Sequence, residues 1–323
     1  MTERKPTPEG VAAAAKRIAG HVVETPLLPL EWRGIRLWVK AECLQEGGSF
    51  KLRGATNRLL LLGESERPRG VVAFSSGNHA QGVAIAARRL GIPATIVMPS
   101  DAPAVKREAT LAAGAEIVAY DRATQSREEI ASRLAEARGA VLVPSFDDVD
   151  VIEGQGSVGI EIAKALGAAP DRVLVPCGGG GLSAGIALAC PGARIVTVEP
   201  EGWDDMARSL EAGEPVPVVE PAPPTLCDAL QTRLVSPLTL GVLRDSGASG
   251  LFVTETEIEA AMAFAARHLR IVAEPGGSVA LAALLAGKAG EVTKRTVVVV
   301  SGGNVDPELY AAIVGAQAAE AAR

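Results

Sequence analysis

Short apolar runs rich in valine and isoleucine alternate with helical segments along most of this 323-residue chain. Between residues 71 and 143 the expected strands cover 71–74, 94–98, 116–119 and 141–143, and a helix that ends at a glycine separates each from the next. Parallel strands need a long crossover, which a helix supplies, and they are buried on both faces. The alternation therefore predicts an α/β protein with parallel sheets.

The rest of the chain continues the alternation. The pattern predicts helices over 7–19, 52–62, 151–166, 182–189 and 254–269, and strands over 37–39, 173–175, 195–198, 251–253 and 297–300. Thr254 begins its helix with a capping box, because Glu257 follows three residues later. The proline-rich stretch 215–224 is typical of a surface connection. No linker divides the chain cleanly, so we expect two α/β domains with the first segment folded back onto the second half.

Four consecutive glycines, Gly178, Gly179, Gly180 and Gly181, lie between the strand at 173–175 and the following helix. Bare backbone lets several N–H groups converge, and the helix N-terminus adds the positive end of a dipole. This arrangement favours a phosphate. A tight strand-to-helix turn is the alternative, but two glycines would satisfy it and four cost backbone entropy.

Two other Gly/Ser-rich segments also follow expected strands: Ser75-Ser76-Gly77-Asn78-His79 and Ser301-Gly302-Gly303-Asn304. In open parallel sheets, ligands bind beyond the carboxyl ends of the strands. If the three segments converge, they line one site with backbone donors, hydroxyl groups and an amide. Such a site suits a small anionic ligand that carries a phosphate.

Lys51 falls at an expected helix start, beside Phe50 and after two glycines. An amine held against an apolar surface loses proton affinity, and a neutral amine can form a Schiff base or transfer a proton. The alternative for an isolated lysine is a solvent-exposed helix face, and the three ligand-shaped loops favour the chemical role instead.

The segment from Gly154 to Gly159 matches the G-x-G-x-x-G pattern of dinucleotide-binding proteins. A nicotinamide-dependent oxidoreductase is therefore an alternative of a different class. That function needs a buried strand directly before the glycines, and residues 146–150 make a poor strand. The segment is better interpreted as a structural or ligand-adjacent helix start.

Composition excludes several classes of partner. The formal net charge is −6 with both signs mixed, and no basic stripe is present, so no nucleic-acid partner is expected. No apolar run approaches the ~20 residues that cross a bilayer, and the polar start lacks a signal sequence, so we expect a cytoplasmic protein with no membrane partner. The four cysteines and three histidines show no metal-binding spacing.

Taken together, these segments resemble the fold-type II pyridoxal-phosphate (PLP) enzymes, specifically the serine/threonine dehydratase and serine racemase family. Residues 49–55 look like the cofactor-lysine motif, 76–82 like the substrate and cofactor loop, 178–181 like the phosphate loop and 301–304 like the pyridine-end motif. The resemblance covers nearly the whole chain. It implies a tryptophan synthase β-like α/β fold of two open parallel-sheet domains, with the active site between them.

The same resemblance implies a division of the chain and a partner. Residues 1–69 plus 147–323 would form a large PLP-binding domain, and residues 70–146 a small substrate-side domain. The family also suggests a homodimer. The chain stops soon after its last expected helix, near Ala319, so we expect a catabolic enzyme without the regulatory domain of biosynthetic threonine dehydratases.

The resemblance assigns a role to each motif residue. Lys51 would hold PLP as a Schiff base and then act as the base at the substrate α-carbon, and Ser76 would be a second catalytic residue, as in the racemase, or one more carboxylate donor. The cofactor would bind Phe50, Lys51, Asn78, Gly178, Gly179, Gly180, Gly181 and Ser301. The substrate carboxylate would bind Ser75, Ser76, Asn78 and His79.

A cation site is also implied, because residues 199–205 resemble the family's divalent-metal segment. Glu199, Asp205 and the main-chain carbonyl of Trp203 would be ligands. Oxygen ligands suit Mg²⁺ or Ca²⁺. A solvated acidic loop that caps the next helix is the alternative.

The expected reaction is a PLP-dependent β-elimination of a small hydroxy amino acid, of the serine/threonine dehydratase type, which gives a 2-oxo acid and ammonia. The alternatives within the family are a 3-hydroxyaspartate ammonia-lyase and a serine racemase. A non-catalytic ligand-binding protein on the same scaffold is a further alternative.

Overall fold

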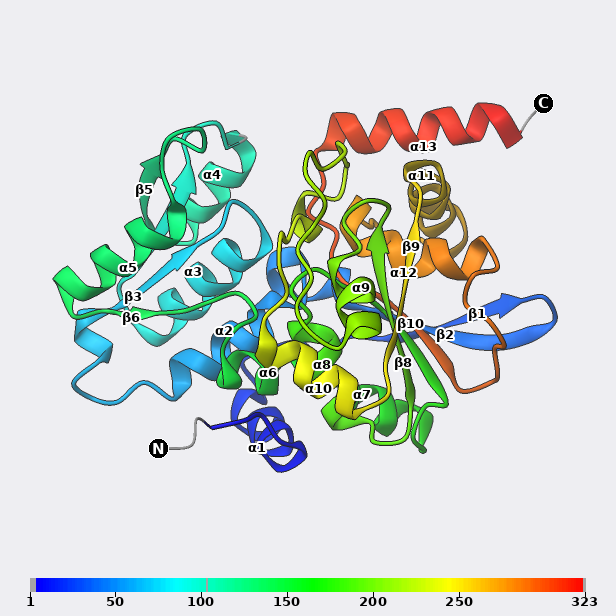
Figure 1. Cartoon of the computed structure of the whole chain (residues 1–323), viewed down its shortest axis with the longest axis horizontal. Helices are drawn as coiled ribbons and strands as arrows, with labels where there is room; N and C mark the ends of the chain where they lie inside the picture. The colour runs from blue at the N-terminus through cyan, green and yellow to red at the C-terminus, as the bar shows by residue number, and fades with distance from the viewer. Residues whose placement is uncertain (1–3, 103, 322–323) are drawn as a thin grey trace.

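The computed structural model describes residues 4–102 and 104–321, which form two sheets on opposite sides of the molecule (Figure 1). The larger sheet has the order β1 (Leu27–Trp32), β2 (Ile35–Ala41), β10 (Thr296–Val300), β7 (Arg172–Pro176), β8 (Arg194–Pro200) and β9 (Ser249–Val253). The smaller sheet has the order β5 (Glu116–Tyr120), β4 (Ala94–Pro99), β3 (Val71–Phe74) and β6 (Val141–Leu142). The predicted α/β fold with two parallel sheets is confirmed.

One edge of the larger sheet differs from the prediction. β1 pairs antiparallel with β2, whereas every other neighbouring pair of strands in the described residues is parallel. The sequence pattern predicts a strand only at 37–39 in this region, because Pro29 interrupts the apolar run of β1. Proline is tolerated there because β1 is an edge strand. The first segment does fold back onto the second half, since β2 pairs with β10.

Helices connect the strands and cover the sheets. In chain order they are α1 (Pro8–Ile18), α2 (Lys51–Leu60), α3 (Asn78–Leu90), α4 (Ala104–Ala112), α5 (Arg127–Arg138), α6 (Val149–Gln155), α7 (Ser157–Leu166), α8 (Gly181–Ala189), α9 (Asp205–Ala212), α10 (Pro237–Asp245), α11 (Glu255–Phe264), α12 (Pro275–Leu285) and α13 (Pro307–Ala321). Short 3₁₀ turns η1 (Glu42–Leu44), η2 (Glu46–Gly48), η3 (Arg67–Arg69) and η4 (Asp228–Leu230) lie between them, and a π-helical turn, η5 (Ala265–Leu269), follows α11.

The helix starts follow the predicted caps. The Thr7 side chain accepts a hydrogen bond from Gly10 N, and both hydrogen bonds of the Thr254–Glu257 capping box are present. Helix α12 is not predicted from the sequence, because it is buried on almost all sides and has no polar face to reveal a helical period. No helix in the described ranges is both long and apolar enough to cross a membrane.

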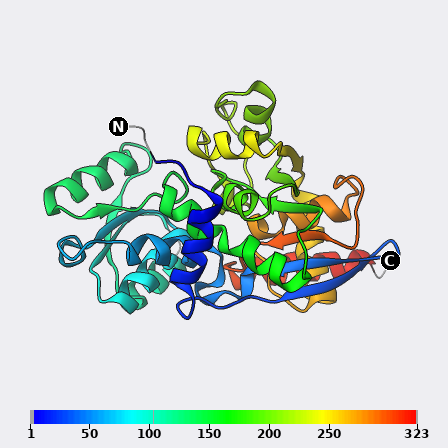
Figure 2. The same ribbon diagram turned by 90° about the horizontal axis from the view of Figure 1, so that it is seen from below.

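Helix α2 joins the two sheets. Its apolar residues Leu52, Ala55 and Leu59 belong to the apolar core of the smaller sheet, although α2 comes before β3 in the chain. Figure 2 shows α1, in dark blue, crossing the middle of the molecule, where it packs on α2, α6, α7 and α8. The division into residues 1–69 plus 147–323 and 70–146 stays a prediction.

The Gly154–Gly159 segment spans the end of α6 and the start of α7, with no strand directly before it in the described chain. A Cβ at Gly154 would lie 2.7 Å from Gly54 Cα, and one at Gly156 would lie 2.7 Å from the carbonyl oxygen of Gly185. These glycines let α6 approach α2 and let the α6–α7 junction approach α8. Close helix packing explains the motif, and the strand–glycine–helix arrangement of a dinucleotide site is absent here.

Candidate active site

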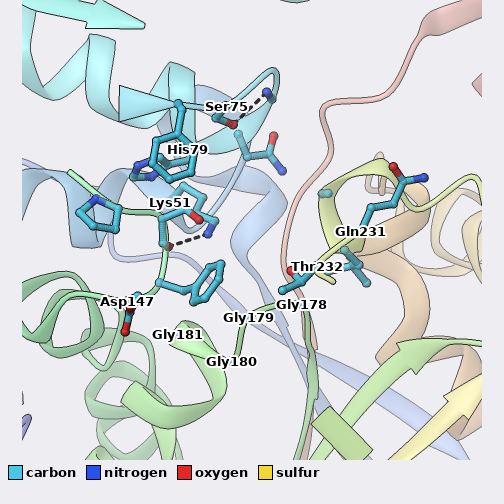
Figure 3. A pocket seen from close by; sticks show the side chains of 18 of the residues that line it. Lys51, Ser75, His79, Asp147, Gly178, Gly179, Gly180, Gly181, Gln231 and Thr232 are labelled. Carbon is cyan, nitrogen blue, oxygen red and sulfur yellow. Dashed lines mark hydrogen bonds between the residues drawn. The ribbon is translucent and has the colours of Figure 1, made fainter. Parts of the chain in front are cut away.

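A cavity of about 710 Å³ opens where the carboxyl ends of the two sheets face each other (Figure 3). Its wall contains Lys51, the loop after β3, the glycine loop after β7 and Ser301 after β10. The structure thus brings together the segments that the sequence analysis expected to converge. The predicted residues Phe50, Ser75, Ser76, Asn78, His79, Gly178, Gly179, Gly180 and Gly181 also line it.

Lys51 is the first residue of α2 and its side chain lies inside this wall. Nζ donates a hydrogen bond to the carbonyl oxygen of Ser145 at 2.9 Å and lies 5.1 Å from the centre of the Phe50 ring. Burial lowers the pKa of Lys51 to about 8. A substantial fraction of the amine is therefore neutral near physiological pH, which is the condition for a nucleophilic or basic lysine.

The segment before Lys51 is tied to the loop that follows β10. Phe50 N donates to the carbonyl oxygen of Ser301 at 3.2 Å, and Ser49 forms an isolated antiparallel bridge with Gly302. Gly303 N also donates to Gly48 O at 2.9 Å. The N-terminus of α2 is therefore fixed against the larger sheet.

The glycine loop links the end of β7 to the first turn of α8. Gly180 has a φ of 84°, and a Cβ on it would lie 2.5 Å from Met206 Cε. Thr239 Oγ1 donates to the Gly179 carbonyl at 2.8 Å, and because a trans peptide is planar, the next N–H points the opposite way. The first helical hydrogen bond of α8 runs from Ala184 N to Gly180 O, so the N–H groups of residues 181–183 have no helical acceptor and can donate to an anion. The Gly180 N–H faces the Cys177 thiol.

The loop after β3 ends at the N-terminus of α3. Ser75 Oγ accepts from Gly77 N at 3.2 Å, and Gln81 N donates to Gly77 O. The amides of residues 78–80 precede this first helical bond, so they can donate to an anion. This loop therefore offers donors for a carboxylate on the opposite side of the cavity from the glycine loop.

The side chain of His79 has no donor to offer to such a carboxylate. Its Nε2 lies 2.8 Å from the carbonyl oxygen of Val143, which can only accept, so the proton is on Nε2. Nδ1 is buried and has no partner within residues 4–102 and 104–321. Burial, and next the charge of Lys51, lower the pKa of His79 to about 3. Only the backbone N–H of His79 can bind the carboxylate that the sequence analysis assigned to this residue.

Asn78 is held by two side chains. Its Nδ2 donates to Glu274 Oε1 at 2.6 Å, and its Oδ1 accepts from Asn304 Nδ2 at 2.8 Å. Glu274 lines the cavity and is buried, but the sequence analysis missed it. An acidic residue in front of the helix start Pro275-Gly276-Gly277 was the one signal that could have drawn attention to it.

The mouth of the cavity carries charges of both signs. Lys106 of α4 pairs with Asp228 of η4, so this ion pair joins the two sides of the opening. Arg127, at the start of α5, has its guanidinium 5.6 Å from the centre of the Phe74 ring. Arg233 also lines the cavity. Each of the three cations is paired with a carboxylate, because Arg127 contacts Glu128 and Arg233 contacts Glu220, so an anionic ligand would compete with these partners.

The candidate cation ligands Glu199 and Asp205 lie outside this cavity. The carboxylate oxygens of Glu199 accept from Met206 N and Ala207 N, each at 2.8 Å. Both carboxylate oxygens of Asp205 are buried and have no partner in the described chain. Burial raises the pKa of Glu199 well above its usual range and that of Asp205 to about 7. The indole of Trp203 donates to Pro223 O, away from the pair.

These groups fit a cation only in part. Two unpartnered buried oxygens on Asp205 are what a hard cation would neutralise. No group of three or more His, Cys, Asp or Glu side chains suited to a metal was found among the residues that the structure describes. Carbonyl oxygens and water would have to complete the coordination.

Residues 18–303 match the family described as pyridoxal-phosphate dependent enzyme. The chain is 42% identical to an L-threo-3-hydroxyaspartate ammonia-lyase of a Pseudomonas species, over 94% of this chain and 97% of that protein. It is 40% identical to the Saccharomyces cerevisiae enzyme of the same name, over 96% of each chain. It is also 38% identical to a serine racemase of Schizosaccharomyces pombe, over 95% of this chain and 96% of that one.

Solved structures share the fold over nearly the same length. Maize serine racemase superposes with a TM-score of 0.89 at 35% identity, covering 99% of this chain and 100% of that chain. The processed form of threonine deaminase isoform 2 from Solanum lycopersicum superposes with a TM-score of 0.87 at 32% identity, covering 96% of this chain and 95% of that chain.

Proposed function

The chain belongs to the pyridoxal-phosphate dependent enzyme family, and from this membership we propose that it is an ammonia-lyase acting on a β-hydroxy amino acid. The reaction removes the hydroxyl group as water and releases a 2-oxo acid and ammonia. The observation that carries the proposal is a partly buried lysine of lowered pKa, Lys51, in the wall of a cavity that also contains a glycine loop at a helix N-terminus.

The cavity residues fit the cofactor. Lys51 would attach to its aldehyde carbon, and the backbone N–H groups of Gly178–Gly181 would bind its phosphate. Phe50 would pack on the ring, Asn78 would bind the 3-hydroxyl group, and Ser301 would face the ring nitrogen. When bound, the cofactor withdraws electrons from the substrate α-carbon and makes its C–H bond acidic.

The protein side chains would orient the substrate and move its proton. The hydroxyl groups of Ser75 and Ser76 and the N–H groups at the start of α3 would bind the α-carboxylate. This contact would hold the α-carbon near Lys51, whose amine would take the α-proton. The neutral, buried ring of His79 would exclude water without adding charge.

We favour 3-hydroxyaspartate over serine and threonine as the substrate. Two relatives at 40% and 42% identity are named for the L-threo isomer. This substrate carries a second carboxylate, and the mouth of the cavity carries Lys106, Arg127 and Arg233. Serine and threonine have no charged group that would use these cations.

A panel assay tests both the reaction and the substrate. Purified holoenzyme is incubated with L-threo-3-hydroxyaspartate, L-serine and L-threonine, and 2-oxo acid and ammonia are measured in each reaction. We expect equal amounts of the two products and the highest kcat/KM for the hydroxyaspartate. If no amino acid of the panel released a 2-oxo acid, the lyase proposal would be wrong.

Racemisation of serine is a second candidate, favoured by Ser76 in the cavity wall and by the similarity to serine racemases. A hydroxyl group across the substrate from Lys51 would be needed to return a proton to the other face. Chiral chromatography of the L-serine reaction measures D-serine directly. Ser76→Ala should abolish D-serine formation, whereas 2-oxo acid release should continue, because Ser75 and the N–H groups at the start of α3 would still bind the α-carboxylate.

We also propose that Glu199, Asp205 and the carbonyl oxygen of Trp203 take up Mg²⁺ or Ca²⁺. The support is the pair of unpartnered Asp205 oxygens. Binding to the folded state should raise the melting temperature with cation concentration. Asp205→Asn, which keeps the shape but weakens the ligand set, should lose this shift, and an equal shift in the variant would contradict the site.

The homodimer remains a prediction that size-exclusion chromatography can test.

A further inference from the structure

Glu274 is a buried carboxyl group in the cavity wall to which the proposed reaction gives no role. It lies directly before α12 and is only 3% exposed. Its backbone N–H donates to Gly302 O at 3.0 Å, and its own carbonyl accepts from Ser278 Oγ at 2.9 Å. Its side chain is therefore held beside the loop that follows β10.

A chain of hydrogen bonds fixes the orientation of the two amide side chains near Glu274, those of Asn304 and Asn78. The Gly47 carbonyl can only accept, so the atom of Asn304 that lies 2.7 Å from it is the donor Nδ2. The same Nδ2 of Asn304 also donates to the side chain of Asn78 at 2.8 Å, so the Asn78 atom that it contacts is the acceptor Oδ1. The other side of the Asn78 amide, Nδ2, must then donate to Glu274 Oε1.

This order also locates any proton on the carboxyl group of Glu274. Oε1 receives the Asn78 N–H at 2.6 Å and cannot carry a hydrogen of its own in that direction. Because the carbonyl oxygen of a protonated carboxyl group is the better acceptor, we place the proton of Glu274 on Oε2. In this form, the carboxyl group is neutral and still accepts from Asn78.

The surroundings of Glu274 favour the neutral form. No ion pair to its carboxyl group is present among the described residues, and the nearby charges, Asp228 and Lys106, are paired with each other. The thiols of Cys43 and Cys227 also face this region, and burial raises the pKa of each, so both are neutral. Burial, and next Asp228, raise the pKa of Glu274 to about 8, against smaller opposing effects of Asn78, Lys106 and the Asn304 N–H.

We propose that Glu274 is a positioning residue that keeps a proton on Oε2, fixes the amide of Asn78 toward the cofactor, and keeps negative charge away from that contact. The link to the cofactor depends on the proposed function, in which Asn78 binds the acidic 3-hydroxyl group. The proton on Glu274 does not depend on it. If Glu274 lost that proton, only the amide of Asn78 would separate its negative charge from the 3-hydroxyl oxygen of the cofactor. That oxygen is itself acidic, so the two negative charges would repel each other.

An infrared titration of the cofactor-free protein tests the proton without any catalysis. The carbonyl stretching band of a protonated carboxyl group is followed with pH in the wild type and in Glu274→Gln. Buried Glu199 and Asp205 contribute similar bands, so the Glu274 band is identified as the one that the variant lacks. We expect this band at about pH 6 and its loss at about pH 10, two units either side of a pKa of about 8.

Substitutions of two charged neighbours, Asp228 and Lys106, should move the midpoint of the Glu274 titration in opposite directions. Asp228→Asn removes a negative charge and releases Lys106, so the midpoint should move down. Lys106→Gln removes the cation and releases Asp228, so the midpoint should move up. A Glu274 band already absent at about pH 6 would overturn the proposal, because the carboxyl group would then be ionised well below its pKa of about 8.

Cofactor affinity tests the positioning role. Lys51 also titrates near pH 8, so the wild-type pH profile alone cannot separate the two groups. We therefore compare the dissociation constant for pyridoxal phosphate in the wild type with that in Glu274→Gln, which keeps an acceptor for Asn78 but cannot ionise. The dissociation constant of the wild type divided by that of the variant should rise by roughly tenfold from about pH 6 to about pH 10. A roughly tenfold change is the effect of a like charge that shifts a neighbouring pKa by about one unit.

A ratio that stays constant with pH would show that Glu274 does not control the cofactor contact and would overturn the positioning role. This outcome differs from failure of the ammonia-lyase proposal. That proposal fails in the product assay with amino acids, whereas both measurements here use no substrate.

Discussion

Lys51 differs from the other cavity lysine, Lys106, in the charges around it. Lys106 has an acidic partner, Asp228, whereas Lys51 has no ion-pair partner among the described residues, and its Nζ donates to a backbone carbonyl beside an aromatic ring. An ion pair holds the proton on an amine, and burial without one releases it. Environment therefore distinguishes Lys51, the proposed reactive lysine, from Lys106.

This difference predicts the result of a matched pair of substitutions. Lys51→Ala should abolish the visible absorption of the bound cofactor and lower kcat by about three orders of magnitude, because it removes the attachment and the base together. Lys106→Ala should retain the visible band. Spectra recorded after dialysis, with kcat from 2-oxo acid release, measure both effects. A coloured Lys51→Ala protein with near-normal turnover would refute the assignment.

Glu274 predicts an unusual dependence of stability on pH. Its pKa is about 8 in the folded protein and near 4.5 in the unfolded chain. Between these values the folded state keeps a proton that the unfolded state has lost, so the free energy of unfolding falls as pH rises, by up to about 1.4 kcal/mol per pH unit.

Glu274→Gln lacks this titration. Its free energy of unfolding, relative to that of the wild type, should increase from about pH 5 to about pH 8 and change little above that. Urea unfolding followed by circular dichroism measures the difference. A difference that is the same at both pH values would argue that Glu274 is ionised in the folded protein.

Local motifs in the sequence predict candidate site residues, but they do not reveal residues whose environment is made by distant segments. Lys51 was identified from its neighbours in the chain. The burial of Glu274 results from contacts with Asn78 and Gly302, which lie 196 and 28 positions away. His79 was identified, but its tautomer depends on the carbonyl of Val143, which no local pattern reveals.

At the scale of single elements, the glycine loop and α8 form one unit. Gly180 must adopt a positive φ and lies against Met206, whereas Gly241 in α10 has open space where a Cβ would be. The two glycines therefore make a matched pair: the backbone conformation requires glycine at position 180, and nothing in the structure requires it at position 241.

Gly180→Ala should destabilise the protein by about 1–2 kcal/mol from backbone strain and should weaken cofactor binding, because the phosphate-binding amides would shift. Gly241→Ala should instead stabilise the protein by up to about 1 kcal/mol, since alanine is the better helix former. Thermal unfolding and cofactor titration measure the two effects. Equal changes in both variants would count against a strained glycine loop.

The same scale explains which elements could be predicted. Strands flanked by glycine stops, such as β3, β4 and β7, were found almost to the residue because their apolar runs are short and continuous. β1 was missed because of Pro29, and α12 because its buried sequence has no period. The end of α11 was also missed, since the π-helical turn at 265–269 continues the helical pattern without continuing the α-helix.

For the whole molecule, the important contact is the one between the two sides of the cavity mouth. Lys106 and Asp228 come from elements that pack with different sheets, and both side chains are partly exposed. An ion pair of this kind contributes little to stability, typically below about 1 kcal/mol. Its significance is that it places a cation at the mouth of the cavity.

Lys106→Gln should therefore raise KM for L-threo-3-hydroxyaspartate by several-fold and leave KM for L-serine nearly unchanged. The exposed neighbour Arg107 on the same helix is the control, because it does not line the cavity. Initial rates for both substrates at constant ionic strength give the comparison. A parallel rise in KM for the two substrates would show that Lys106 does not contact the second carboxylate.

Helix α2 is attached to both halves of the molecule at once. Its first residue is fixed through Phe50 to the strand β10 side, while Leu52, Ala55 and Leu59 are packed in the core of the smaller sheet. If one half swings relative to the other without breaking either set of contacts, the pivot must run close to this helix. Lys51 would then stay almost still while the walls of the cavity open and close around it, so the reactive amine is on the part of the enzyme that has the least distance to travel.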